Sequence, residues 1–256
     1  MIARKKEEIE ILREGGQKLA AILEDVIKQA KPGVTTASLD ALAEKMIRDA
    51  GGAPSFKGYK SYHDAYAYPA TLCVSINDEI VHGIPSSRKI IEGDLIGLDI
   101  GMKYKGLFTD MAKTIIVGKF DQAGRELVEI TRNALEIGIG EAKAGGFTGD
   151  IGCAIEEYIE SEGFTVVKEL VGHGVGKSVH EEPEVPNWGD KGTGIKLFEN
   201  MIIAIEPMVN EGSAAVYLDK DKWTWKTKDG KRSAHFEHTI LITKKGAEIL
   251  TKKLEI

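Results

Sequence analysis

Two aspartates lie inside apolar stretches of this sequence, where an ionised side chain is costly to bury. Residues 94–118, DLIGLDIGMKYKGLFTDMAKTIIVG, read as two strands joined by a tight turn, with Asp99 in the first strand and Asp110 in the second. If the hairpin centre lies between Tyr104 and Lys105, the two aspartates are directly opposite, with Cβ atoms about 4.5–5.5 Å apart. Two such carboxylates need a shared proton or a cation between them. The hairpin alone leaves a metal site and solvent-facing side chains as alternatives.

Two glutamates and three histidines extend this pattern. Glu206 ends the apolar run MIIAIEPM, and Glu237 lies near the start of HFEHTILIT. His173 and His180 lie in the glycine-rich segment GHGVGKSVHEEP, where glycines allow a close approach to a common centre. His82 lies in SINDEIVHGIP. Any one of these residues is more often structural, but together with the two aspartates they are typical of a metal-dependent hydrolase.

Helices and strands must bring these side chains together. Apolar residues spaced by three, four or seven predict one helix over residues 9–30 and another over 36–50. A second pair is predicted over 121–143 and 148–162. The pairs resemble each other weakly, which favours two related halves over two unrelated helical hairpins. The matching residues are Lys31, Gly33, Thr36, Glu44, Ile47 and Gly51, against Lys143, Gly145, Thr148, Glu156, Ile159 and Gly163.

Strand-like runs occur between and after the helices. No Pro/Ser-rich linker divides the sequence, so we expect one α+β domain over residues 1–256, with helices covering a largely antiparallel sheet. The expected strands are 71–76, 94–101, 108–117, 165–171, 201–205 and 236–243.

The composition excludes several classes of protein. Hydrophobic residues make up 42% and charged residues 29% of the 256 residues, which is ordinary for a soluble globular protein. The formal net charge of -6 argues against nucleic acid as the substrate. The two cysteines, Cys73 and Cys153, have no CxxC partner and favour a reducing compartment. With no signal-like h-region and no span-length apolar run, we expect a cytoplasmic protein that does not enter a membrane.

Six segments in order resemble the motifs of the type I methionine aminopeptidases, which belong to peptidase family M24. The resemblance covers essentially the whole chain and implies the pita-bread (creatinase/aminopeptidase) fold, an antiparallel sheet covered by two pseudo-symmetric helix pairs. It also implies removal of the initiator methionine from nascent proteins when the second residue is small, in the manner of a bacterial-type enzyme. The segments are SINDEIVHGIP, LDIG, FTDMAKT, GHGVGKSVHEEPEVPN, MIIAIEPMVNEG and WKTKDGKRSAHFEHT.

The resemblance implies roles for individual residues. Asp110 and Glu237 would bridge two divalent metal ions, and a set of carboxylates with one imidazole suits Co, Mn, Fe(II) or Zn. His82 and His180 would be catalytic residues on the substrate side, and Glu206 would both bind metal and move the proton of the attacking water. The five metal-binding positions are matched by Asp99, Asp110, His173, Glu206 and Glu237.

Motif position also indicates a methionine pocket, for which the alternative is plain core packing. The expected lining residues are Tyr59, Tyr68, Cys73 and Trp223, with Phe56 as a further candidate. This sequence departs from the family at residues 60–67, KSYHDAYA, a tyrosine-rich insertion that carries His63. The insertion leaves core packing as an alternative to the pocket for the preceding residues Phe56 and Tyr59.

Other functions remain open at this stage. They are a proline-specific aminopeptidase of the same fold, a non-catalytic binding protein on this scaffold, and a structural module whose acids are solvated. For the peptidase, we expect a monomer that acts on the N-terminal methionine of nascent polypeptides, with the ribosome as a further candidate partner.

Overall fold

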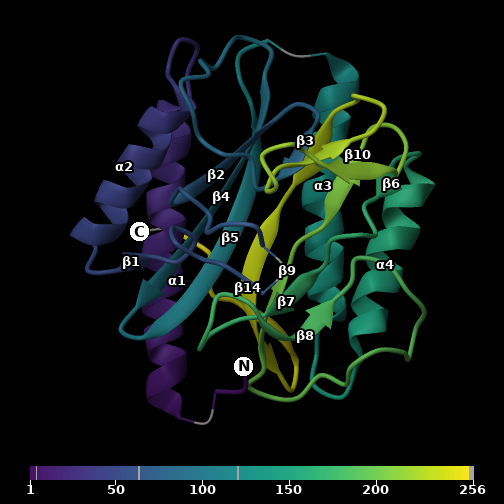
Figure 1. Ribbon diagram of the computed structural model, residues 1–256. Helices are drawn as coiled ribbons and strands as arrows, with labels where there is room; N and C mark the ends of the chain where they lie inside the picture. Colours follow the sequence, from purple (N-terminus) through teal and green to yellow (C-terminus); the bar gives the residue numbers. More distant parts are fainter. Residues whose placement is uncertain (4, 63, 120, 254–256) are drawn as a thin grey trace.

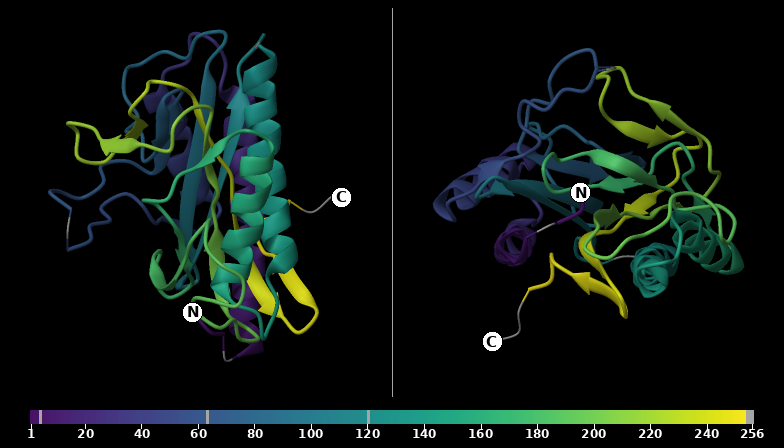
Figure 2. Two further views of the ribbon diagram at one scale, coloured as in Figure 1. Left: turned by 90° about the vertical axis from the view of Figure 1, so that its right-hand side faces the viewer. Right: turned by 90° about the horizontal axis from the view of Figure 1, so that it is seen from below.

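The computed structural model describes residues 1–256 except 4, 63, 120 and 254–256. Four helices and a curled antiparallel sheet make up its framework. Figure 1 shows one helix pair beside one half of the strands and the second pair beside the other half. Seen from the side, all four helices lie on one face of the sheet, and irregular segments project from the opposite face (Figure 2). The predicted α+β class and the two helix pairs are confirmed.

The helices begin and end where local residues dictate. Thr35 accepts a hydrogen bond from the backbone N–H of Ser38 at the start of the second helix, and Asp121 accepts one from Gly124 at the start of the third. The turn inside each pair uses a glycine with a positive φ, Gly33 in the first pair and Gly145 in the second. The bounds are α1 Lys6–Gln29, α2 Thr36–Asp49, α3 Gln122–Glu141 and α4 Thr148–Ser161. In the described part of the chain, no helix has the length and apolarity needed to cross a membrane.

The main sheet has nine strands in the order β1-β4-β5-β14-β9-β7-β8, with β2 paired to β4 and β15 paired to β14. All of these pairings are antiparallel, as predicted. The bounds are β1 Ala53–Pro54, β2 Leu72–Ile76, β4 Leu95–Tyr104, β5 Leu107–Ile116, β7 Gly172–Gly174, β8 Glu181–Val185, β9 Ile202–Ile205, β14 Glu237–Thr243 and β15 Gly246–Ile249.

Two small three-stranded sheets adjoin the main one. Their orders are β13-β10-β6 and β11-β12-β3. The strand predicted over 165–171 is shorter in the structure and ends at Val166, where β6 stops pairing with β10. The remaining bounds are β3 Glu79–Val81, β6 Thr165–Val166, β10 Met208–Asn210, β11 Val216–Leu218, β12 Trp225–Thr227 and β13 Ser233–His235.

The register of the β4–β5 hairpin differs from the prediction. Asp110 pairs with Gly101, and Asp99 pairs with Ala112, so the two aspartates are diagonal neighbours and the directly opposed arrangement is wrong. The cause is the turn: residues 105 and 106 both have positive φ, 47° and 91°, as a two-residue hairpin loop requires. The hairpin centre therefore lies one residue later than predicted. A diagonal pair still shares one face of the sheet.

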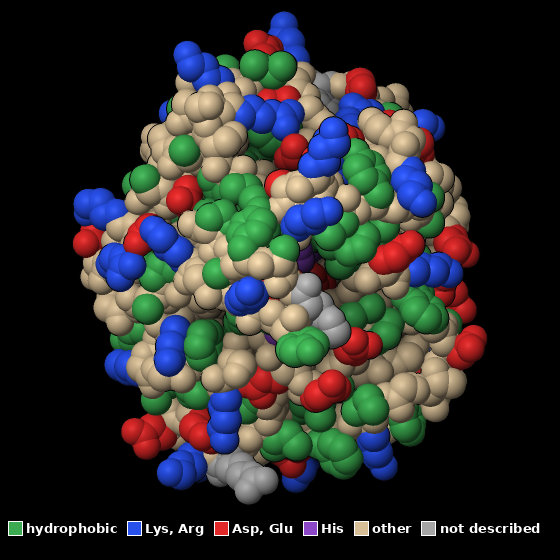
Figure 3. All heavy atoms as spheres, in the orientation of Figure 1, with side chains coloured by type: hydrophobic (Ala, Val, Ile, Leu, Met, Phe, Trp, Pro, Cys, Tyr) green, Lys and Arg blue, Asp and Glu red, His purple; other side chains and the backbone are tan. Residues whose placement is uncertain are grey.

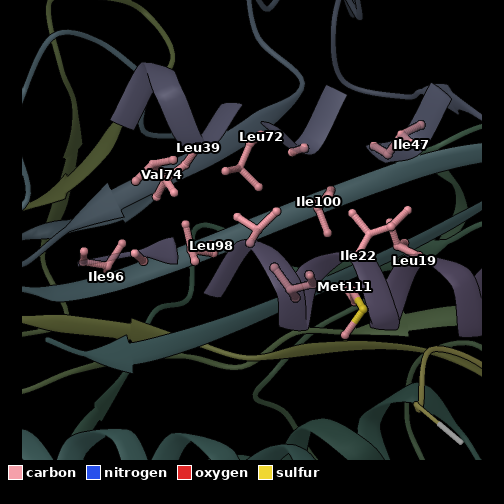
Figure 4. Close-up of a cluster of buried hydrophobic side chains, with 14 of the residues drawn as sticks. Leu19, Ile22, Leu39, Ile47, Leu72, Val74, Ile96, Leu98, Ile100 and Met111 are labelled. Atoms are coloured by element: carbon pink, nitrogen blue, oxygen red, sulfur yellow. The ribbon is translucent and has the colours of Figure 1, made fainter. Parts of the chain in front are cut away.

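Alternation along the strands separates the core from the opposite face. Ile96, Leu98 and Ile100 of β4 point toward α1 and α2 and belong to the first hydrophobic cluster (Figure 4). In the other half, Ile203 of β9 and Ile240 of β14 pack against α3 and α4 in a second cluster. Residues at the intervening positions of these strands therefore face away from the helices.

Candidate metal centre

The five candidate ligands come from five adjacent strands of the main sheet. Their strands form the continuous run β4-β5-β14-β9-β7 within the sheet order. Asp99 alternates with the core residues of β4, and Glu206 follows the last core residue of β9, so both lie on the face opposite the helices. The ligands in strand order are Asp99, Asp110, Glu237, Glu206 and His173.

Side-chain atoms of these residues converge. One carboxylate oxygen each from Asp99, Asp110 and Glu237 lie within 4.8 Å of one another. Ligand atoms of His173, Glu206 and Glu237 satisfy the same condition, so Glu237 belongs to both groups. Asp110 joins a further group with His173 and His180. Two overlapping groups around shared carboxylates can hold two cations close together.

Burial makes this cluster unstable without a cation. Burial raises the pKa of Asp99 to about 7 and that of Glu206 to about 8. It also raises the pKa of Asp110 and Glu237 well above the usual range, and neighbouring carboxylates add to both shifts. One oxygen on each of Asp99, Asp110 and Glu237 is buried without a hydrogen-bond partner among the described residues. Unpaired buried oxygens of this kind fit a divalent cation.

His173 is held in the form that can bind a metal. Its Nδ1 lies 2.9 Å from the backbone oxygen of Gly174, which can only accept, so Nδ1 carries the proton. The unprotonated Nε2 then faces Glu206 Oε1 at 3.4 Å and Glu237 Oε1 at 4.0 Å. Burial lowers the pKa of His173 to about 3, which keeps the ring neutral. Three electron-rich atoms facing one another are stabilised by a cation, and the donor set contains no thiolate.

Other residues hold the ligands in place. The hydroxyl of Thr239 donates to the backbone oxygen of Asp110 at 2.8 Å and accepts from its N–H at 2.9 Å. The side-chain amide of Asn187 donates to the backbone oxygen of Glu206 at 3.0 Å. These contacts fix the backbone of two ligands independently of any bound ion.

A cavity of about 630 Å³ opens above the ligands. Figure 3 shows a hollow near the middle of this face, with histidine and acidic side chains at its bottom. His82 and His180 both line the cavity, and burial lowers the pKa of each to about 4, so both rings are neutral at pH 7. The ring of His180 lies 4.5 Å from that of His173, centroid to centroid.

One wall of this cavity is apolar and aromatic. The ring of Trp223 packs edge-on against Tyr68 at 5.2 Å, and both belong to a buried cluster with Phe56 and Cys73. Tyr59 packs against this cluster and lies 4.8 Å from the ring of His180. All five residues proposed from the sequence for a methionine pocket thus line the same cavity as the ligands.

Two residues near the site were not found from the sequence. His235 is buried, and its Nε2 lies 3.6 Å from Glu206 Oε2. A histidine two positions before Glu237 in the segment SAHFEHT was the available signal, since such residues share a strand face. Asp64, in the insertion at 60–67, lines the cavity, and no pattern in the sequence marked it. His63 of that insertion lies outside the described residues.

The family model of metallopeptidase family M24 matches residues 10–244, and the chain belongs to this family. It is therefore a metallopeptidase by family and uses divalent metal.

Similar proteins within the family are methionine aminopeptidases. The chain is 45% identical to methionine aminopeptidase 1 of Bacillus subtilis over 252 residues, covering 98% of this chain and 99% of that protein. It is 46% identical to the methionine aminopeptidase of Aquifex aeolicus, with 96% of each chain covered. The resemblance to methionine aminopeptidases found in the motifs is confirmed.

Solved structures agree with this placement. A crystal structure of methionine aminopeptidase from Thermotoga maritima matches with a TM-score of 0.93 and 45% identity, covering 99% of this chain and 100% of that chain. Prolidase from Pyrococcus furiosus matches with a TM-score of 0.78 and 25% identity, but this chain covers only 66% of it. The expected pita-bread fold is confirmed.

Proposed function

We propose that this protein is a methionyl aminopeptidase that removes the N-terminal methionine from nascent proteins whose second residue is small. The observation that carries the proposal is the convergence of five metal-binding side chains beside an aromatic wall in one cavity. The similar methionine aminopeptidases, matched over nearly their whole length, support it.

The proposed ligands are the five convergent residues, with Asp110 and Glu237 shared between two divalent ions. Such ions, when bound, would supply a water that is acidic enough to attack at neutral pH and would polarise the scissile carbonyl. The carboxylate and imidazole donors suit Co, Mn, Fe(II) or Zn. Metal analysis of the purified protein, after exchange into each ion, tests how many ions bind per chain and which ion the site prefers.

Glu206 is the proposed proton carrier. Its side chain is 14% exposed to the cavity, whereas that of Glu237 is 3% exposed. The more accessible carboxylate can take a proton from water and deliver it to the leaving amine. Replacement by Gln should lower kcat by about a hundredfold or more.

His82 and His180 are the proposed substrate-side residues. Because both rings are neutral at pH 7, each has one N–H to donate and one nitrogen that accepts. In the proposed mechanism, His180 donates to the oxygen that gains charge during attack, and its position beside His173 supports this role. His82 borders Trp223, with ring centroids 6.2 Å apart, and its proposed role is to contact the backbone nitrogen of the scissile bond.

The methionine side chain would occupy the aromatic wall formed by Tyr59, Tyr68, Cys73 and Trp223, with Phe56 behind them. Buried aromatic rings offer a large apolar surface, and sulfur packs favourably against them. This assignment concerns substrate binding, so its variants should change KM more than metal content.

Three peptides test the function. The metal-loaded protein should cleave Met-Ala-Ser faster than Met-Leu-Ser and should leave Ala-Pro-Ser intact. Preference for Ala-Pro-Ser would instead support a proline-specific aminopeptidase, since prolidases share the fold. Equal cleavage by chelator-treated and metal-reconstituted protein would contradict the metal-dependent mechanism. Binding of methionyl peptides without turnover, at full metal content, would indicate a non-catalytic binding protein.

We further propose that residues 1–256 form a single catalytic domain that acts as a monomer in the cytoplasm, with the ribosome as a candidate partner. Light scattering of the purified protein tests the oligomeric state, and co-sedimentation with ribosomes tests the second point.

A further inference from the structure

The described residues of the insertion at 60–67 border the cavity, which Ser61 and Asp64 line. The base of the insertion is closed by a hydrogen bond from the N–H of Gly58 to the oxygen of Tyr68, at 2.8 Å. Near its C-terminal end, the hydroxyl of Tyr66 donates to the backbone oxygen of Asp221, and the Tyr66 ring packs edge-on against Trp223 at 6.4 Å. The insertion and the segment around Asp221 project from the same face of the sheet, away from the helices (Figure 2).

A second cavity of about 310 Å³, open to solvent, lies beside the insertion and is lined in part by Asp64 and Ala65 of this segment. Three residues of its lining, Asp64, His82 and Trp223, also line the larger cavity above the candidate ligands. The two cavities are therefore neighbours that meet at His82. The remaining lining residues of the second cavity are Ala65, Leu218, Lys222 and Trp225.

Charge is distributed unevenly between the two sides of this second cavity. The backbone N–H of Ser61 donates to Asp64 Oδ2 at 2.6 Å, which fixes the carboxylate where it borders both cavities. The described lining of the larger cavity contains no Lys or Arg, whereas the second cavity is lined by one cation, Lys222, as well as by Asp64. Burial lowers the pKa of His82 and His180, and the Asp64 carboxylate opposes both shifts, as a nearby negative charge must. Lys222 is exposed at the outer rim.

We propose that the second cavity binds the side chain of the third residue of the substrate and that Asp64 makes the enzyme favour Lys or Arg at this position. The proposal rests on the proposed aminopeptidase function, because it takes the peptide to pass His82 as it leaves the scissile bond. The scissile bond joins the first and second residues, so the next residue along the peptide is the third, and His82 lines the second cavity as well as the first.

The lining suits a long cationic side chain. Trp223 and Trp225 both line the cavity and offer apolar surface to its methylene groups. The Asp64 carboxylate accepts hydrogen bonds from an ammonium or guanidinium group. An acidic third residue would face the same carboxylate and be repelled.

Matched peptides measure the preference. We compare kcat/KM for Met-Ala-Arg-Ser, Met-Ala-Gln-Ser and Met-Ala-Glu-Ser with the metal-loaded enzyme. The arginine peptide should be cleaved about twofold to fivefold faster than the glutamate peptide, the range of one partly solvated charge pair, and the ratio should shrink with salt.

Two variants should shift this ratio in opposite directions. Asp64→Asn should reduce the Arg/Glu ratio toward one, whereas Lys222→Gln removes a repelling charge and should increase the ratio. Asp190→Asn, an exposed site outside both cavities, is the control for net charge and should leave the ratio unchanged.

The outcomes separate this proposal from the proposed function. An enzyme that cleaves all three peptides at equal rates, or an Asp64→Asn variant that keeps the wild-type ratio, overturns the third-residue preference and leaves the aminopeptidase intact. Failure to cleave any methionyl peptide overturns both.

Discussion

Removing the metal should make the stability of this protein fall as pH rises from 7 to 8. Without a cation, the folded state keeps protons on buried acids, since burial raises the pKa of Glu206 to about 8 and also raises the pKa values of Asp110 and Glu237 well above their usual range. The unfolded chain releases these protons near its ordinary pKa, about 4. The stabilisation from such a raised pKa is fully present when the pH is below the pKa of the group in the unfolded chain. It is lost as the pH rises through the pKa of the group in the folded protein.

The magnitude follows from the number of protons. Each acid that stays protonated in the folded state lowers the free energy of unfolding by about 1.4 kcal/mol per pH unit. Glu206, with a pKa of about 8, is largely protonated at pH 7 and about half protonated at pH 8, so it alone gives a slope of about 1 kcal/mol per pH unit. The raised pKa values of Asp110 and Glu237 act in the same direction. Buried histidines act in the opposite direction, because their lowered pKa values make stability rise with pH only up to about 6.5. The range above pH 7 therefore isolates the acids.

Urea unfolding, followed by tryptophan fluorescence at pH 7.0, 7.5 and 8.0, measures this slope. The chelator-treated protein should show it, and the metal-loaded protein should not, because bound cations keep the carboxylates ionised. In the metal-free protein, Glu206→Gln should reduce the slope, whereas the exposed Glu199→Gln should not. A flat profile for the metal-free protein, or equal slopes with and without metal, would refute the reasoning.

Three further predictions concern single residues. Gly138→Ala should lower the free energy of unfolding by about 1–3 kcal/mol, because the added β-carbon would lie 2.6 Å from a side chain of α4. Gly140→Ala, in the same helix but with open space around it, should raise this free energy by about 0.5–1 kcal/mol. Urea unfolding measures both changes. Thr239→Val removes both hydrogen bonds to the backbone of Asp110 and should lower the free energy of unfolding by about 1–3 kcal/mol. It should also weaken metal binding, which calorimetry measures. An unchanged metal affinity would show that these two hydrogen bonds are not needed to position Asp110. Trp223→Ala should raise KM for methionyl peptides about tenfold or more while metal content stays constant, and unchanged kinetics would remove this residue from the pocket.

The helices were predictable because their signals are local. Apolar spacing marks the buried face of each helix, and Thr35 and Gly33 mark where α1 and α2 are joined. The strands of the main sheet were also predictable where they are long and apolar. β11 and β12 were missed because three-residue strands are too short to show alternation.

The hairpin register was missed for a different reason. Lys105 adopts a positive φ, and this one residue moves the hairpin centre. A positive φ can be expected at a glycine but is uncommon for lysine, so the sequence did not predict it. Acids in apolar strands pointed to the ligands, because burying a carboxylate without compensation is so costly. Asp64 gave no such signal, since an aspartate in a polar insertion is ordinary until the fold places it over a cavity.

The strand order also has a consequence for how a newly made chain matures. Asp99 and Asp110 lie in one half of the molecule and His173 and Glu206 in the other, while β14, which carries Glu237, joins them in the middle of the sheet. Neither half contains a complete set of donors. The complete set of five donors is therefore assembled only after synthesis has passed residue 237 and β14 has been inserted between the two halves.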